Sequence, residues 1–194
     1  MEISGSQFEL EGNYGLILDL RGGSISAKES GFFSGGGRTA SLIVLNRTRG
    51  NLNNIALHAS AVDYASSLEA RASELILSDG SLEVSARDTN AVLLENCAAI
   101  ILGTHFQVSG AFSIKAFEIR GQFPLVQDCR FYYSGSAARS EVFSATDVPK
   151  AGNIAGNVFS GFTHIWGPGW PMERLPAFNQ DYASRDKPNT SLRP

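Results

Sequence analysis

The sequence predicts an all-β chain folded as a single-stranded parallel β-helix of about six to seven coils. Each coil is expected to hold three short strands, and an irregular tail is expected to follow the last one. Two observations lead to this prediction. A signature of an apolar residue, a serine and a small residue returns every 24 to 30 residues. Between its copies, short apolar clusters alternate with polar residues, which is the period-two pattern of β-strands.

The signature marks one turn of the solenoid each time it appears. Its copies are Ile3-Ser4-Gly5, Phe33-Ser34-Gly35, Val84-Ser85-Ala86, Val108-Ser109-Gly110, Tyr133-Ser134-Gly135 and Phe159-Ser160-Gly161, with Leu57-His58-Ala59 filling the gap after the second. Three short strands cannot bury their apolar faces alone, so each is expected to pair with its equivalent in the next coil. With strands about 4.8 Å apart, six steps span roughly 29 Å.

Three apolar sets are expected to form ladders inside the solenoid. They are Leu18, Ile43, Leu68, Leu93 and Phe117; then Leu75/Leu77, Ile100/Leu102 and Leu125; then Ile55/Leu57, Leu82/Val84, Phe106/Val108 and Phe131/Tyr133. This register places Leu94 on the outer face. A helix competes for residues 64–77, which contain good helix formers. The strand prediction is preferred because the equivalent segments of the following coils do not look helical.

Interruptions of the rhythm are expected to project as loops on one face. They are the glycine-rich segment 30–40 and the long polar segment 136–153. The pattern stops after Phe162, where five of the seven prolines and both tryptophans follow. We therefore expect a β-helix over residues 1–166 and a tail over 167–194 that covers the last coil.

The tail offers three aromatic candidates for binding. Trp166, Trp170 and Phe178 are expected to anchor the tail on the last coil, or else to contact a sugar or a partner protein. At the other end, residues 1–12 supply a first coil with Ile3, Phe8 and Leu10 directed inward. An uncovered strand edge invites pairing, so this coil is expected to meet an upstream part of a longer chain or a second copy.

The Asn-x-Phe-x-Gly ending of residues 157–161, the asparagine Asn96 at a corner and the coil length resemble one known group of proteins. This is the right-handed, pectate-lyase-like parallel β-helix superfamily, and the resemblance covers about residues 1–166. It implies a right-handed solenoid. It implies no single activity, since this scaffold carries lyases, hydrolases, phage tailspikes, adhesins and surface proteins.

Composition narrows the classes of partner. A formal net charge of −3 provides no basic footprint for nucleic acid. No run approaches the roughly 20 apolar residues of a membrane span, and the first residues lack the features of a signal peptide. Cys97 and Cys129 are expected to be buried rather than bridged. No cofactor is expected, and no metal site, because His58, His105 and His164 fall at different places in their coils.

Six charged residues are the candidates for catalysis. Asp19, Glu69 and Glu118 are expected to form an outward acidic row beside an outward row of Arg21, Arg71 and Arg120. Because of the resemblance, such rows could bind an acidic sugar and abstract a proton, and paired carboxylates could hydrolyse a glycosidic bond. The alternative is a solvated face on which opposite charges offset each other, with each pair worth less than about 1 kcal/mol.

These observations favour a structural or interaction module over an enzyme. We expect it to be extracellular or displayed at a cell surface and to bind a glycan or a protein partner through its loops and tail. The alternative function is a polysaccharide lyase or glycoside hydrolase that acts on an acidic or bacterial polysaccharide. Its site would use the carboxylates and arginines of the two outward rows.

Overall fold

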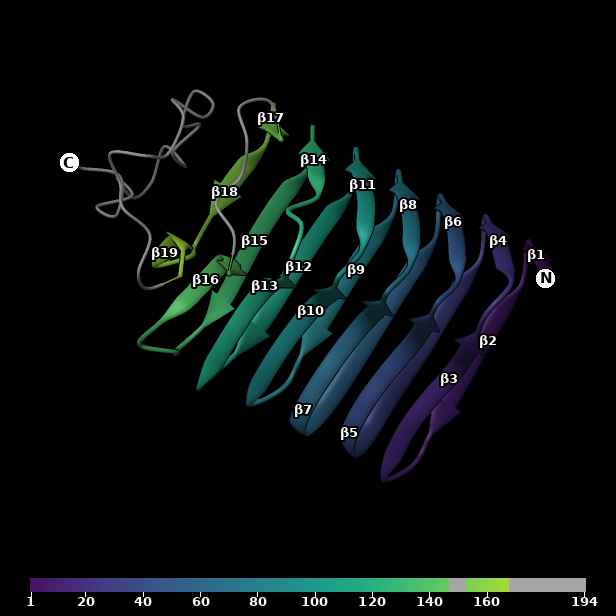
Figure 1. The fold of residues 1–194 in the computed structure, drawn as a ribbon. Coiled ribbons are helices and arrows are strands. Elements are labelled where there is room, and N and C mark those ends of the chain that lie inside the picture. The colour runs from purple at the N-terminus through teal and green to yellow at the C-terminus, as the bar shows by residue number, and fades with distance from the viewer. Residues whose placement is uncertain (147–152, 168–194) are drawn as a thin grey trace.

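The computed structural model describes residues 1–146 and 153–167, and these residues form a parallel β-solenoid of about six turns (Figure 1). The described part of the chain contains no helix, which confirms the strand prediction for residues 64–77. It therefore holds no helix long and apolar enough to cross a membrane. All strand pairs are parallel, as expected when each strand pairs with its equivalent in the next coil.

Each coil adds one strand to each of three ladders. The first ladder is a seven-stranded sheet, here called sheet A: β1 (Glu2–Ser4), β4 (Ser24–Lys28), β6 (Arg49–Asn53), β8 (Glu74–Ser78), β11 (Ala98–Leu102), β14 (Leu125–Gln127) and β17 (Ile154–Ala155). The second contains β2 (Gln7–Glu11), the first parts of β5 (Gly31–Asn46) and β7 (Ala56–Arg71), β9 (Ser81–Ser85), β12 (His105–Gly110), β15 (Arg130–Gly135) and β18 (Val158–Ser160). The third contains β3 (Tyr14–Arg21), the last parts of β5 and β7, β10 (Asp88–Glu95), β13 (Ser113–Arg120), β16 (Ser140–Ala145) and β19 (His164–Trp166).

The corners between these ladders repeat one backbone conformation. The corner after sheet A has a residue with positive φ in every coil: Gly5, Glu29, Asn54, Asp79, Gly103, Asp128 and Gly156. The corner before sheet A repeats it at Gly22, Arg47, Ala72, Asn96 and Gly121. From Gly5 to Asp128, the amide of each such corner donates to the next coil, as Asn54 N does to Ser78 O at 2.8 Å. The chain therefore turns sharply without leaving these donors unpaired.

Hydroxyl and thiol groups support the corners from inside. Ser30 and Thr104 follow a positive-φ residue, and each donates its side-chain hydroxyl to the carbonyl two residues earlier. The thiols do the same: Cys97 Sγ lies 3.3 Å from Glu95 O, and Cys129 Sγ lies 3.2 Å from Gln127 O. Both cysteines are free and buried, as expected. They occupy corner positions that other coils give to serine or threonine.

The interior is mostly aliphatic in the early coils, apart from Phe32, and mostly aromatic in the later ones. Phe106 and Phe131 stack with ring centroids 4.7 Å apart, and Phe117 stacks on Phe143 at 5.6 Å. Trp166 continues this row, 5.1 Å from Phe143. In the first coil, Phe8 stacks on Phe32 at 5.0 Å while it remains 37% exposed.

The predicted register of one coil was wrong. Leu68 and Phe117 pair with Val92, whereas Leu93 pairs with Glu69 in the outward row. The step from Leu68 to Val92 is 24 residues instead of the 25 assumed, and both Ala91 and Val92 are fully buried. The missing residue lies in the corner before β10: two residues separate Ser85 from Asp88, where three separate Ser60 from Tyr64, so all of β10 is shifted by one position. Leu94 is consequently inward and 1% exposed.

The second apolar set contained the same kind of error. Ala99 and Ile101 pair with Leu75 and Leu77, so Ile100 points outward and is 38% exposed. The third set was closer to the structure, because Phe106 pairs with Leu82 on one side and with Phe131 on the other, as expected. Among the signature serines, Ser85, Ser109 and Ser134 share one row, whereas Ser4 lies in sheet A.

The first expected loop is largely strand, and the second contains one strand. Segment 30–40 lies mostly in β5, where Gly36 has φ 82° and the pairing register shifts on both sides of Gly37. A Cβ on Gly37 would lie 1.8 Å from Gly12 O, so glycine permits close packing there. Segment 136–153 contains β16, and its residues 147–152 lie outside the described part.

We predict that Leu94→Ala destabilises the protein by about 2–5 kcal/mol, because it opens a cavity in the core. Leu93→Ala should cost less than half as much, because Leu93 packs on the outer face and lies outside the core cluster. Urea unfolding followed by circular dichroism measures both variants. A larger loss for Leu93→Ala would contradict the register.

We also predict that both thiols are protected from alkylation in the folded protein. Burial raises the pKa of Cys97 and raises that of Cys129 to about 12, so the reactive thiolate is scarce. Mass spectrometry after iodoacetamide treatment should show slow labelling of the native protein and rapid labelling in denaturant. Rapid labelling of the native protein would show that these corners open.

Candidate functional site

The acidic and basic rows form on the outer face, as the sequence predicted. Asp19, Glu69 and Glu118 lie in one ladder position, with Val44 and Leu93 between them. Each carboxylate meets the arginine two residues later. Arg21 lies 3.0 Å from Asp19, Arg71 lies 3.6 Å from Glu69, and Arg120 lies 2.6 Å from Glu118.

Glu118 has the most complete set of partners. Its Oε2 accepts hydrogen bonds from Asn90 Nδ2 at 2.7 Å and Lys115 Nζ at 2.9 Å, and its Oε1 accepts two from Arg120. Burial opposes ionisation, but these donors together outweigh it and lower the pKa of Glu118 to about 2. The carboxylate is therefore ionised at neutral pH and holds its neighbours in place. A group with this pKa is poorly matched to general acid or base catalysis near neutral pH.

The spacing of the acidic row also limits its chemistry. Carboxylates two strands apart in one ladder are separated by about 9.6 Å of backbone. Inverting glycosidases hold their two carboxyl groups roughly 6.5–9.5 Å apart, with room between them for a water molecule. Here the strand between Glu69 and Glu118 contributes Leu93, which is 6% exposed. Apolar packing therefore occupies the space that an attacking water would need.

A polar hollow of about 380 Å³ lies beside Glu118. Its lining is Asp63, Tyr64, Arg87, Asp88, Thr89, Asn90, Ser113, Lys115 and Glu118, from the third ladder and the corner before it. Asn90 is 8% exposed, and its Oδ1 is buried without a hydrogen-bond partner within the described residues. The amide orientation is fixed, because Nδ2 donates to an ionised carboxylate. An acceptor left unpaired in this way costs about 1–3 kcal/mol.

Tyr64 forms one wall of the polar hollow. Burial, together with the negative charge of Glu69, raises the pKa of Tyr64, so the phenol keeps its proton at neutral pH. The polar hollow therefore offers an aromatic ring, a neutral hydroxyl, amide groups, carboxylates and cations in one small space. Groups of this kind form hydrogen bonds with ligands rich in hydroxyls.

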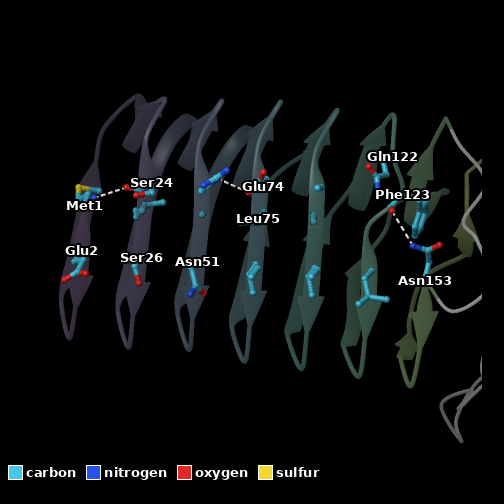
Figure 2. A pocket seen from close by; sticks show the side chains of 18 residues that line it. Met1, Glu2, Ser24, Ser26, Asn51, Glu74, Leu75, Gln122, Phe123 and Asn153 are labelled. Atoms are coloured by element: carbon cyan, nitrogen blue, oxygen red, sulfur yellow. Dashed lines mark hydrogen bonds and ion pairs between the residues drawn. The ribbon is translucent and has the colours of Figure 1, made fainter.

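A larger groove, of about 830 Å³, runs along the outer face of sheet A (Figure 2). In Figure 2 its labelled side chains extend from Met1 and Glu2 on the first strand to Phe123 and Asn153 near the last. Met1 N donates to Ser24 O at 2.8 Å, and Asn153 Nδ2 donates to Pro124 O at 3.2 Å. The groove therefore follows the solenoid axis and crosses the strands.

The floor of this groove changes from polar to aliphatic along the axis. One outward row reads Glu2, Ser26, Asn51, Ile76, Ile100 and Leu125. Ile76 remains 43% exposed. The charged side chains Arg49 and Glu74 form an exposed ion pair at 3.0 Å. The groove can hold an extended chain by van der Waals contact, but its lining includes no exposed aromatic ring.

Sequence reasoning missed both hollows. The register error placed Ile100 inside the solenoid, which hid the aliphatic strip of the groove. The polar hollow draws Tyr64, Asn90 and Lys115 from three successive coils, and none of them carries a motif. The usable signal was the ladder position that Ser66, Asn90 and Lys115 share, an outward row of polar residues.

Of the three aromatic candidates for binding, only Trp166 lies within the described residues. Trp166 is 9% exposed and packs against Phe123 and Phe143, so it belongs to the core row. Trp170 and Phe178 lie outside the described residues. Among residues 1–146 and 153–167, no group of histidine, cysteine and acidic side chains could hold a metal ion.

Comparison with known proteins finds no matching family model, no similar curated protein and no similar solved structure.

We predict that Glu118 makes stability depend on pH in the acid range. Its folded pKa is depressed, so its contribution is present above the unfolded pKa near 4.5 and is lost as pH falls toward 2. Thermal unfolding between pH 5 and pH 2 should show this loss in the native protein and a shallower loss in Glu118→Gln. Glu9→Gln, at an exposed position of the first coil, is the matched control. Equal slopes for Glu118→Gln and the native protein would contradict the network.

Proposed function

We propose that this protein is a non-catalytic interaction module that binds a glycan through the polar hollow. The observation that carries the proposal is the hollow itself, which gathers hydroxyl, amide and ion-paired charged groups in one small space. A sugar hydroxyl that entered the hollow would find hydrogen-bonding groups already held in place. The tyrosine ring beside it would provide a surface for the apolar face of a sugar.

The charges of the polar hollow support a neutral ligand. Arg87 lies 3.0 Å from Asp88 and 3.9 Å from Asp63, and Lys115 lies 2.9 Å from Glu118. Each cation therefore already has a carboxylate partner. A strongly acidic polysaccharide would have to displace these partners, whereas a neutral glycan could form hydrogen bonds to them as they stand.

The rival function is a lyase or hydrolase that uses the two outward rows. It would require a carboxylate free to exchange a proton. Glu118 is held ionised by three side chains, and Asp19 and Glu69 line neither the polar hollow nor the groove of sheet A. These features favour binding without cleavage. The resemblance to the pectate-lyase-like superfamily and a location outside the cell or on its surface remain parts of the proposal.

We expect the purified protein to be retarded in native gels cast with at least one neutral polysaccharide and to release no reducing ends from it. Asn90→Ala should weaken the retardation about tenfold or more, since a buried hydrogen-bonding group is worth roughly 1–3 kcal/mol. Asn51→Ala, in the groove of sheet A, is the matched control and should bind normally.

Time-dependent cleavage of any polysaccharide would contradict the proposal. If that cleavage disappeared in Glu69→Gln and Arg71→Ala, the enzyme alternative would hold and its site would be the outward rows. Absence of binding to every neutral polysaccharide would also reject the proposal.

A further inference from the structure

Aromatic and arginine side chains alternate along one edge of the solenoid, at the start of the third ladder. Coil by coil they are Tyr14, Arg38, Tyr64, Arg87 and Phe112, here called the aromatic–arginine line. Tyr14 and Phe112 are 73% and 72% exposed, which is unusual for rings of this size. Tyr64 is half-buried and lines the polar hollow.

Strand pairing fixes the alignment of this line. Tyr14, Thr39, Tyr64, Asp88 and Ser113 occupy one ladder position in five successive coils. Arg38, Arg87 and Phe112 each directly precede a member of that row. The Arg87 amide donates to Val62 O, and the Phe112 amide donates to Arg87 O, so the adjacent row is continuous as well. Tyr14 and Tyr64 therefore share one ladder position two coils apart, about 9.6 Å along the axis. Phe112 lies two coils beyond Tyr64, in the adjacent row.

The arginines between the rings are neutralised by a chain of carboxylates. Arg38 contacts Asp63 Oδ2 at 2.9 Å through both Nε and an outer guanidinium nitrogen. Asp63 also faces Arg87, which contacts Asp88 at 3.0 Å. These ion pairs hold the guanidinium planes in place at the surface. They also leave the edge with little net charge.

We propose that the aromatic–arginine line is the binding track of an extended, neutral, linear polysaccharide that lies parallel to the solenoid axis. The inference rests on the proposed function and names its ligand class and direction. Sugar rings stack on the exposed aromatic side chains, and their hydroxyls bond the ion-paired guanidinium and carboxylate groups between them. The polar hollow, at Tyr64, is the central subsite of the track.

The regular spacing of the rings along the solenoid axis selects the ligand. A ribbon-like, β-1,4-linked glycan presents sugar faces at regular intervals along a straight axis, and two coils correspond to about the length of a disaccharide. Single-stranded nucleic acid can also use aromatic rings and arginines, but it needs cations that are free to meet phosphates. Here each arginine of the track already has a carboxylate partner.

Isothermal titration with cello-oligosaccharides and xylo-oligosaccharides tests the track. Affinity should rise from the disaccharide to the hexasaccharide, because the longer ligand reaches a second ring. Tyr14→Ala and Phe112→Ala should each weaken hexasaccharide binding about tenfold, equivalent to one aromatic contact, and should leave disaccharide binding unchanged. Both side chains are exposed, so unchanged thermal unfolding should confirm that the variants fold.

Tyr132→Ala is the matched control, since Tyr132 is a partly exposed ring on β15, in the second ladder. It should bind as the native protein does. Affinity should also change little with added salt, as expected for an uncharged ligand. Polygalacturonate and a single-stranded DNA oligonucleotide serve as the charged comparators.

The outcomes separate the track from the proposed function. If neutral oligosaccharides bind but Tyr14→Ala and Phe112→Ala bind as the native protein does, the track is wrong and the glycan function stands. If no neutral oligosaccharide binds, both are rejected. If polygalacturonate or the DNA binds more tightly than the neutral oligosaccharides, and this binding weakens with added salt, the proposal of a neutral ligand is wrong.

Discussion

The hydrogen bonds between coils at the corners are the constraint on which the rest of this structure depends. Arg47 and Ala72 adopt a left-handed backbone conformation, which costs such residues roughly 1–2 kcal/mol. Their amides nevertheless pair with the following coil, at 2.9 Å and 2.8 Å. These corners keep successive coils in register, and that register aligns the polar and charged side chains of the outer faces into rows.

The fold could be predicted from the sequence because the repeat implies how the apolar residues must be buried. Short apolar clusters at near-constant intervals can be buried only by stacking, and the stacked strands were found. What could not be predicted was local register. The corner between Ser85 and Asp88 is one residue shorter than its equivalent in the preceding coil, so β10 is shifted by one position and Leu93 and Leu94 exchange faces. Gly37 similarly allows a register shift within a long strand, where its composition had indicated a loop.

The candidate site could likewise be predicted only in part. Asp19, Glu69 and Glu118 could be placed on one outer row by counting, together with the arginines that pair with them. Counting residues along the repeat could not show that Asn90 and Lys115 both contact Glu118. The first contact joins neighbouring coils, and the second joins residues three apart on one strand. Nor could it show that Tyr14 and Phe112 project from the same edge. Such contacts depend on side-chain direction, which the apolar pattern does not encode.

Charge pairing connects the fold to the proposed function. Most ion pairs of the outer face involve an exposed arginine and contribute little to stability, whereas the network around Glu118 is partly buried. Their effect is instead to fix the positions of polar side chains and to cancel the field along the edge. A surface with ordered hydrogen-bonding groups, exposed rings and little net charge suits a neutral polymer better than an anionic one.

The most direct test of this account is the mapping of backbone amide shifts by NMR during titration with a neutral hexasaccharide. The account predicts that the perturbed amides cluster around residues 14, 38, 64, 87 and 112, in five successive coils, with the groove of sheet A unaffected. Perturbations confined to residues 24–26, 49–51 and 74–76, or spread evenly over the solenoid, would contradict it.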